Sequence, residues 1–227
     1  MATAVHRIET LHADRIAAPE APFHALQRRF SGRYARDPFG LDSQVADTLI
    51  PVLNTLVRAT VLHPEHVPVD GPAVIVSNRG FGLAEPTALA LAVKQATGRR
   101  LRVVGAPSTP LIGPASRRIG AIAASDHDVT AALRAGHLVG VPLAATLLRT
   151  DAGAAPLALA QAMTHNPIVP AAVKPIGRFG GVIGSWTVRF GPLVTLPEAY
   201  DPDDPLAAAR FADAMRSAVH ELLVDEM

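Results

Sequence analysis

The feature that most constrains the fold is a short apolar run that ends in a glycine-containing turn. Residues 73–76 read Ala-Val-Ile-Val, the turn begins at Ser77-Asn78, and Glu85-Pro86 opens the next apolar stretch. Four apolar residues bounded by turn signals are typical of a strand buried on both faces. A proline near the first position of the following segment is typical of a helix start. The pattern predicts a strand that turns directly into a helix over residues 85–96.

The same alternation of short apolar runs and helical patterns continues along the chain. We expect strands over residues 101–105, 119–122, 138–141, 168–173 and 186–194, and helices over 43–62, 128–135, 156–164 and 206–224. The helix over 43–62, behind a cap at Asp42 or Ser43, either packs on the core, which we favour, or lies on a membrane interface. The sequence therefore predicts an α/β domain over residues 42–227, with a central mixed, mostly parallel sheet flanked by helices. A polar N-terminal arm, residues 1–41, precedes it.

Composition excludes several classes of protein. Apolar residues make up 49% of the chain, which is incompatible with general disorder. The net charge is +1, from 21 basic and 20 acidic residues, so no basic surface for a nucleic acid is expected. Cysteine is absent, which excludes disulfides, thiolate catalysis and cysteine-bound zinc. We expect no metal and no nucleic-acid partner.

The N-terminal residues bear on location. Residues 1–20 lack a continuous apolar core, and no run of about 18 apolar residues occurs anywhere, so neither a signal peptide nor a membrane span is expected. We expect a cytoplasmic protein, either soluble or peripheral on the inner membrane face. The basic cluster over residues 27–36 is either a solvated arm, which we favour, or a contact for anionic lipid head groups.

Five blocks of sequence, in order, carry a family resemblance over residues 58–197. The first is the stretch from Val67 through Ser77-Asn78-Arg79 to Pro86, and the others are residues 118–122, 131–136, 138–142 and 166–173. Together they resemble the phospholipid/glycerol acyltransferase family. The resemblance implies the glycerolipid-acyltransferase fold and transfer of an acyl chain to a lipid hydroxyl. It also implies acyl-CoA or acyl carrier protein as donor or ligand, without a further cofactor.

The catalytic positions of that family are altered in this chain. Where the family has a histidine that acts as general base, this chain has Arg79, whose guanidinium stays protonated. Where the family has the aspartate that orients this histidine, the chain has Ala84. Glu85 follows one residue later, which on a helix is a rotation of about 100°. The resemblance therefore implies a domain that lacks the family's catalytic pair.

The positions that bind substrate in the family are altered as well. After Pro142 the family has Glu-Gly-Thr-Arg, where this chain reads Leu143-Ala144-Ala145-Thr146, and Arg149 follows three residues later. Arg79 either binds an anion at the strand-to-helix turn, which we favour, or is a surface residue. Candidate binding residues on this basis are Asn78, Arg79, Gly80, Gly82, Pro142, Leu143 and Arg149.

Two further clusters have both a chemical and a structural interpretation. Asp126-His127-Asp128 offers a base with carboxylate neighbours, but a helix cap formed by Asp126 or Asp128 is the favoured interpretation. His63-Pro64-Glu65-His66 offers metal ligands, but proline disfavours the helix that would bring them together, so we expect a surface turn.

These observations lead to one leading hypothesis and two alternatives. The leading hypothesis is an acyltransferase-like protein that binds an acyl lipid or an acyl thioester, or regulates a partner enzyme, without catalysis. The first alternative is an active acyltransferase with a rearranged site, in which Glu85, Asp126 or His127 supplies the base and Arg79 or Arg149 holds an anion. The second is a structural partner subunit whose interior is filled by side chains.

Overall fold

The computed structural model describes residues 36–78, 84–105, 110, 112–143, 166–176, 184–194 and 204–224. Its strands are β1 (Val57–Leu62), β2 (Ala73–Asn78), β3 (Leu101–Val104), β4 (Ala121–Ile122), β5 (Leu138–Leu143), β6 (Ile168–Ile176) and β7 (Gly184–Phe190). Its helices are α2 (Ser43–Leu56), α3 (Ala84–Thr97), α4 (Ile112–Arg118), α5 (Asp126–Arg134) and α7 (Pro205–Val224), with a short 3-10 turn, η1, over Pro64–His66.

The strands form one sheet in the order β1-β7-β6-β2-β5-β3-β4. All neighbouring strands are parallel except β6 and β7, which are antiparallel. β2 lies at the centre between β5 and β6, where no sheet edge is open to water. The predicted α/β architecture with a mixed, mostly parallel sheet is confirmed.

Side chains of β2 alternate between two layers of the core. Ala73 and Ile75 belong to the cluster that packs on α3, whereas Val74 and Val76 belong to the cluster that packs on α5 and α7. All four are fully buried. A strand covered on both faces reads as a continuous apolar run, because successive side chains point to opposite faces.

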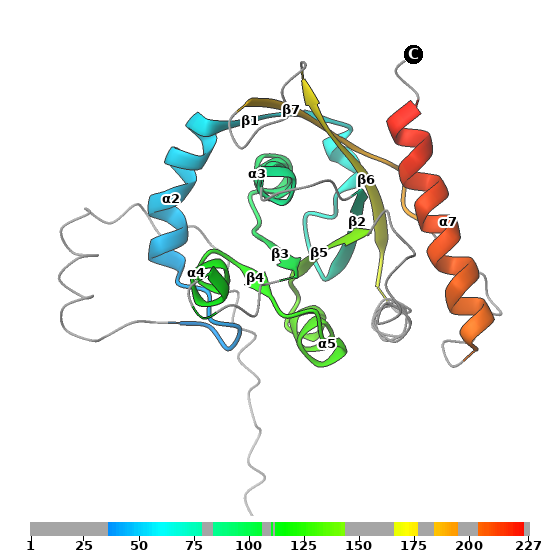
Figure 1. Cartoon of the computed structure of the whole chain (residues 1–227), viewed down its shortest axis with the longest axis horizontal. Helices are drawn as coiled ribbons and strands as arrows, with labels where there is room; N and C mark the ends of the chain where they lie inside the picture. The colour runs from blue at the N-terminus through cyan, green and yellow to red at the C-terminus, as the bar shows by residue number, and fades with distance from the viewer. Residues whose placement is uncertain are drawn as a thin grey trace, which may run out of the picture.

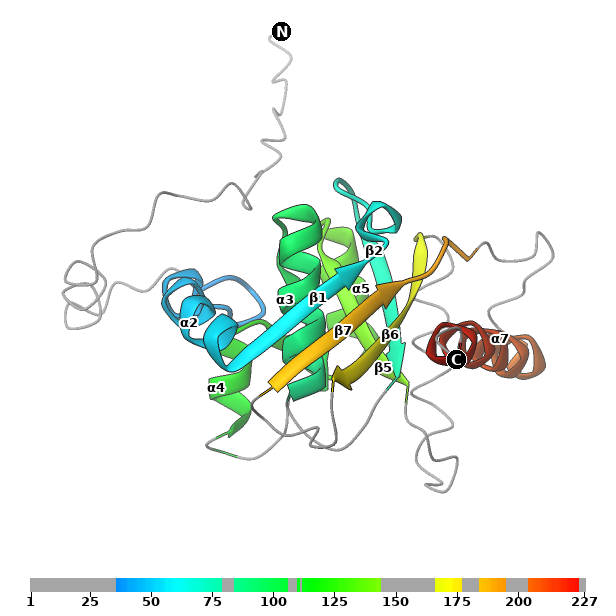
Figure 2. The same cartoon turned by 90° about the horizontal axis from the view of Figure 1, so that it is seen from above.

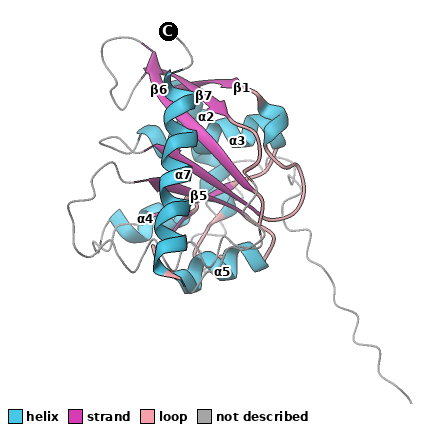
Figure 3. Cartoon of the chain, turned by 90° about the vertical axis from the view of Figure 1, so that its right-hand side faces the viewer, coloured by secondary structure: helices cyan, strands magenta, loops and turns pink. Residues whose placement is uncertain are grey.

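The sheet curves around α3, as the view along this helix shows (Figure 1). α3 contacts β1, β3, β5, β6 and β7. α2 contacts β1, α3 and α4, and it crosses the side of α3 that the sheet leaves open (Figures 1 and 2). α7 lies on the opposite face, along β6 and β2 (Figure 3).

The prediction of one helix over residues 43–62 is wrong in its last six residues. The helix ends at Leu56, and Val57–Leu62 form the edge strand β1 beside β7. β-branched residues favour strands, and Val57 is buried at the start of this one. Asp42 caps α2 as expected, with its carboxylate accepting a hydrogen bond from the backbone N–H of Val45 at 3.1 Å.

Two predicted strands are shorter than expected. The strand expected over residues 119–122 is limited to Ala121–Ile122, because the chain still turns at Ile119 and Gly120. The strand expected over 186–194 ends at Phe190, after which Val194 forms an isolated bridge with Ile168. The helix expected over 156–164 lies outside the described residues.

Candidate functional site

An apolar cavity of about 540 Å³ lies under α2. α2, α3 and α4 line it together with parts of β2, β3 and β5. Its lining is mainly aliphatic, with Leu49, Ile50, Leu53, Leu56, Leu89 and Leu101 among its members. Its volume falls within the range of about 300–1,000 Å³ that is usual for ligand sites in proteins. The described interior of the domain is therefore not completely filled by side chains.

The cavity reaches the carboxyl ends of β2 and β5. Ser77, Asn78 and Pro142 come from these strand ends, and Ala84 and Glu85 come from the start of α3. Ligands of open α/β sheets bind at the carboxyl edge of parallel strands. Residues from both sides of the turn singled out in the sequence thus contribute to one cavity.

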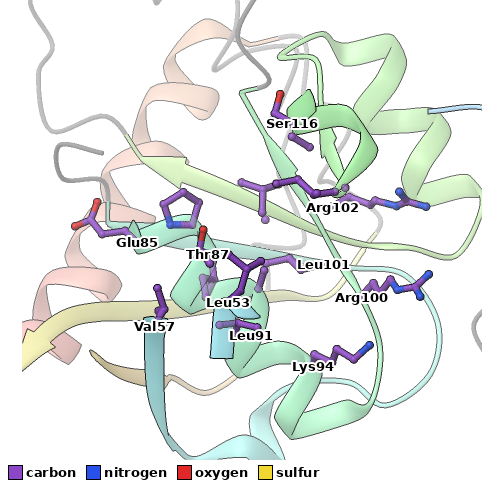
Figure 4. Close-up of a pocket in the computed structure, with 18 of the residues that line it drawn as sticks. Leu53, Val57, Glu85, Thr87, Leu91, Lys94, Arg100, Leu101, Arg102 and Ser116 are labelled. Atoms are coloured by element: carbon purple, nitrogen blue, oxygen red, sulfur yellow. The ribbon is translucent and has the colours of Figure 1, made fainter. Parts of the chain in front are cut away.

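The charged side chains of the cavity lie toward its periphery. Figure 4 shows Glu85 on one side and Lys94 and Arg100 on the other. The aliphatic side chains of Leu53, Leu91 and Leu101 lie between them, with Thr87 beside Leu53. This mainly aliphatic interior suits an apolar ligand.

A charged cluster joins α2 to the end of α3 and the start of β3. Arg100 donates two hydrogen bonds of 2.7 Å to the carboxylate of Asp47, and one of 3.0 Å to the hydroxyl of Ser43. Lys94 lies 3.6 Å from the same carboxylate. Both bonds to Asp47 come from Nη2 of Arg100, and charge-assisted hydrogen bonds are stronger than neutral ones. This cluster therefore ties α2 to the start of β3 beside the cavity.

A second ion pair holds residues 37–41 against the sheet. The buried guanidinium of Arg102, on β3, donates to Oδ2 of Asp37. The other carboxylate oxygen, Oδ1, accepts from the backbone N–H groups of Phe39 (3.0 Å) and Leu41 (2.8 Å). Leu41 is buried and lines the cavity. The last residues of the expected N-terminal arm therefore form part of the cavity wall.

Asn78 uses its side chain to extend the sheet. Its Nδ2 donates to the carbonyl oxygen of Val173 at 2.9 Å, and its Oδ1 accepts from the Val173 N–H at 2.7 Å. The backbone ladder between β2 and β6 stops one residue earlier, at Ser77 and Ala171. The amide therefore fixes the end of β2 on β6, and this positions the strand end that borders the cavity.

The other candidate residues from the sequence fall into three groups. Ala84, Glu85 and Pro142 line the cavity. Leu143 packs instead with the core cluster beneath α5 and α7. Arg79, Gly80, Gly82 and Arg149 lie outside the described residues, as do residues 27–35 of the basic cluster.

The Asp126-His127-Asp128 cluster lies at the start of α5 and does not line the cavity. The prediction that Asp126 or Asp128 caps this helix is wrong, because the N-cap is Ser125, whose hydroxyl accepts a hydrogen bond from the Asp128 N–H. Asp126 and Asp128 instead fall within the first helical turn, where negative charge is favourable. His127 is exposed, with Nδ1 3.3 Å from the Asp128 carboxylate.

The histidine-rich turn also lies apart from the cavity lining. His63 and His66 stack with their ring centroids 5.5 Å apart, and Nδ1 of His66 is 2.8 Å from the Phe190 carbonyl oxygen. The pKa of Glu65 is lowered, mainly by a backbone hydrogen bond and, to a smaller extent, by the side-chain hydrogen bond with His63. Among the described residues, no group of three or more histidines and carboxylates is arranged to hold a metal ion. The expected surface turn is observed.

Sequence reasoning missed several residues that shape the cavity. Asp37, Asp47 and Arg102 act through contacts between segments that are far apart in the chain, so no local pattern marks them. The aliphatic spacing in α2 was a usable signal, because Ile50 and Leu53 repeat at helical intervals on the side that faces the cavity.

Comparison with protein-family models, with curated proteins and with solved structures finds no match for this chain. No helix in the described ranges is both long and apolar enough to span a bilayer. The fold and the site define the protein as a member of the α/β class, with a mostly parallel seven-stranded sheet and an apolar cavity beside the central strand.

Proposed function

We propose that this protein binds an acyl chain, presented by a lipid or by an acyl thioester, in the cavity under α2 and does so without catalysing acyl transfer. The observation that carries the proposal is the aliphatic lining of a cavity of about 540 Å³ between α2, α3 and the sheet. The same proposal gives the domain an acyltransferase-like fold. It also includes a role in regulating a partner enzyme.

The chemistry of the lining supports binding over catalysis. The described histidines, which are His63, His66, His127, His137 and His220, do not line the cavity. Ala84, at the position where the acyltransferase resemblance requires an aspartate, is buried and has no polar group. General-base catalysis needs a titratable group within hydrogen-bond reach of the acceptor hydroxyl.

A second candidate function is acyl transfer with a rearranged site. The observation in its favour is Glu85, a half-buried carboxylate that lines the cavity next to the strand-to-helix turn. Incubation of the protein with acyl-CoA and a lysophospholipid distinguishes the two candidates. We expect no transfer above the rate without protein, whereas transfer at an enzyme-like rate would favour this second candidate.

Binding itself is tested by titrating the full chain with a fluorescent long-chain fatty acid. Ala90, on α3, lines the cavity and is partly buried, so Ala90→Phe places a ring inside it. We expect a dissociation constant raised about tenfold or more, since shape-filling substitutions remove the space that the ligand needs.

The matched control is Gln95→Phe, which adds a phenyl ring to an exposed position of the same helix that does not line the cavity. We expect the control to bind the probe like the unaltered protein. Thermal unfolding of both variants identifies any loss of fold. A lack of probe binding by the unaltered protein, or equal binding by a folded Ala90→Phe variant, would refute the proposal.

A further inference from the structure

The apolar face of α2 is wider than the part that the rest of the domain covers. At about 100° per residue, Ala46, Ile50 and Leu53 form one stripe along the helix. Ala46 is buried, and Ile50 and Leu53 are half-buried against the core around α3. A second stripe lies beside the first and consists of Leu49, Val52 and Leu56. All three of these side chains are exposed, Val52 by 53%.

The exposed stripe continues onto the end of α4. Ile119 follows α4 directly and is 46% exposed. Leu49, Leu56 and Ile119 also line the cavity, so these exposed side chains form its rim. We call Leu49, Val52, Leu56 and Ile119 the α2 face. The remaining large exposed apolar residues of the described chain lie outside α2 and α4 and are Val69, Ile176, Leu193, Leu206 and Val224.

Two basic residues adjoin the α2 face in the sequence. Arg117 and Arg118 are exposed and immediately precede Ile119. The acidic residue within α2, Asp47, lies about half a turn from the exposed stripe of Leu49, Val52 and Leu56 and is engaged by Arg100. Basic side chains beside an apolar helix face are complementary to the surface of an anionic bilayer, where each contributes to attraction.

We propose that the α2 face docks this protein on the surface of an anionic lipid bilayer, with α2 lying in the plane of the interface. An amphipathic helix of this kind inserts its apolar face to the depth of the acyl-chain boundary. Because Leu49, Leu56 and Ile119 also rim the cavity, docking brings the cavity opening against the lipid. This inference rests on the proposed function, which identifies the ligand as an acyl chain. It adds that the protein takes this ligand from the lipid bilayer.

The test is co-sedimentation of the full chain with two kinds of vesicle, one of phosphatidylcholine alone and one of equimolar phosphatidylcholine and phosphatidylglycerol. We expect binding to the second kind and much weaker binding to the first. Val52→Asp changes the most exposed residue of the α2 face, one that does not line the cavity. We expect it to lower the partition coefficient about tenfold or more, because an ionised carboxylate replaces inserted methyl groups.

The matched control is Val69→Asp, the same substitution at a position that is 63% exposed and lies outside α2 and α4. We expect it to bind vesicles like the unaltered protein. Replacing Arg117 and Arg118 together by serine should remove most of the preference for phosphatidylglycerol. Loss of the basic charges without loss of that preference would contradict the proposed charge complementarity.

Failure of docking is distinguishable from failure of the proposed function. If the unaltered protein binds the fatty-acid probe but does not bind anionic vesicles, docking is overturned and the cavity proposal stays intact. Equal vesicle binding by folded Val52→Asp would also overturn docking through the α2 face. A dimer that Val52→Asp dissociates, with no vesicle binding, would show that this face joins two copies of the chain instead.

Discussion

Replacing Asp37 by asparagine tests whether residues 37–41 belong to the folded domain. The asparagine Oδ1 keeps the ability to accept hydrogen bonds from the backbone N–H groups of Phe39 and Leu41. Its amide NH₂ group takes the place of Oδ2 and faces the Arg102 guanidinium, which is a donor. The substitution therefore removes the ion pair and leaves the shape of the side chain nearly unchanged.

The expected cost follows from the burial of the pair. Removing one partner of a fully buried ion pair costs about 3–5 kcal/mol. The Arg102 side chain is almost completely buried, whereas that of Asp37 is 23% exposed, so water reduces the loss. We expect a destabilisation of about 2–3 kcal/mol, which corresponds to about 4–12 °C in melting temperature for a chain of this size.

Urea unfolding, followed by the fluorescence of Trp186, measures this cost directly. Trp186 is the single tryptophan of the sequence and is buried on β7. The matched control is Asp213→Asn, which breaks the ion pair with Arg216 on the surface of α7, where the Asp213 side chain is 71% exposed. We expect the control to cost less than about 0.5 kcal/mol. Similar small losses for both variants would refute the assignment of residues 37–41 to the domain.

Two further substitutions test the contacts that β6 makes with neighbouring segments. Asn78→Ala should destabilise the protein by about 2 kcal/mol in urea unfolding, because it removes both side-chain hydrogen bonds to the backbone of Val173; an unchanged midpoint would contradict this role. Gly191→Ala should cost about 1–3 kcal/mol, because a Cβ there would lie 2.8 Å from Cγ of Pro170 and 3.0 Å from Cδ1 of Leu222. If Gly191→Ala is as stable as the unaltered protein in thermal unfolding, the prediction is wrong and Pro170 and Leu222 move to make room for the added Cβ.

Local sequence patterns predicted the centre of the fold but not its edge. Residues 73–76 form a buried strand because their apolar run satisfies both layers of the core. Residues 57–62 follow the apolar run of α2 with no glycine or proline between them, so no breaker marked the helix end, and their apolar/polar alternation is short. Their conformation depends on pairing with Gly184–Phe190, more than a hundred residues later in the chain. Such non-local contacts override weak local preferences.

The candidate site was predictable only in part, for the same reason. The turn after β2 was recognised from Asn78 and Ala84, which are close in the chain and border the cavity. The wall of the cavity depends on Arg102 reaching Asp37 and on Arg100 reaching Asp47, and neither pair is adjacent in sequence. His127 appeared chemically suitable in the sequence, but α5 packs on the other face of the sheet. Residue type alone could not show which face each residue occupies.

The central claim is that the cavity under α2 holds an acyl chain, and native mass spectrometry of the purified full chain tests it most directly. We expect a bound acyl species at one molecule per chain, retained by Gln95→Phe and lost from Ala90→Phe, which places a ring inside the cavity. The claim would be contradicted if the protein has the mass of the chain alone and also fails to take up added fatty acid.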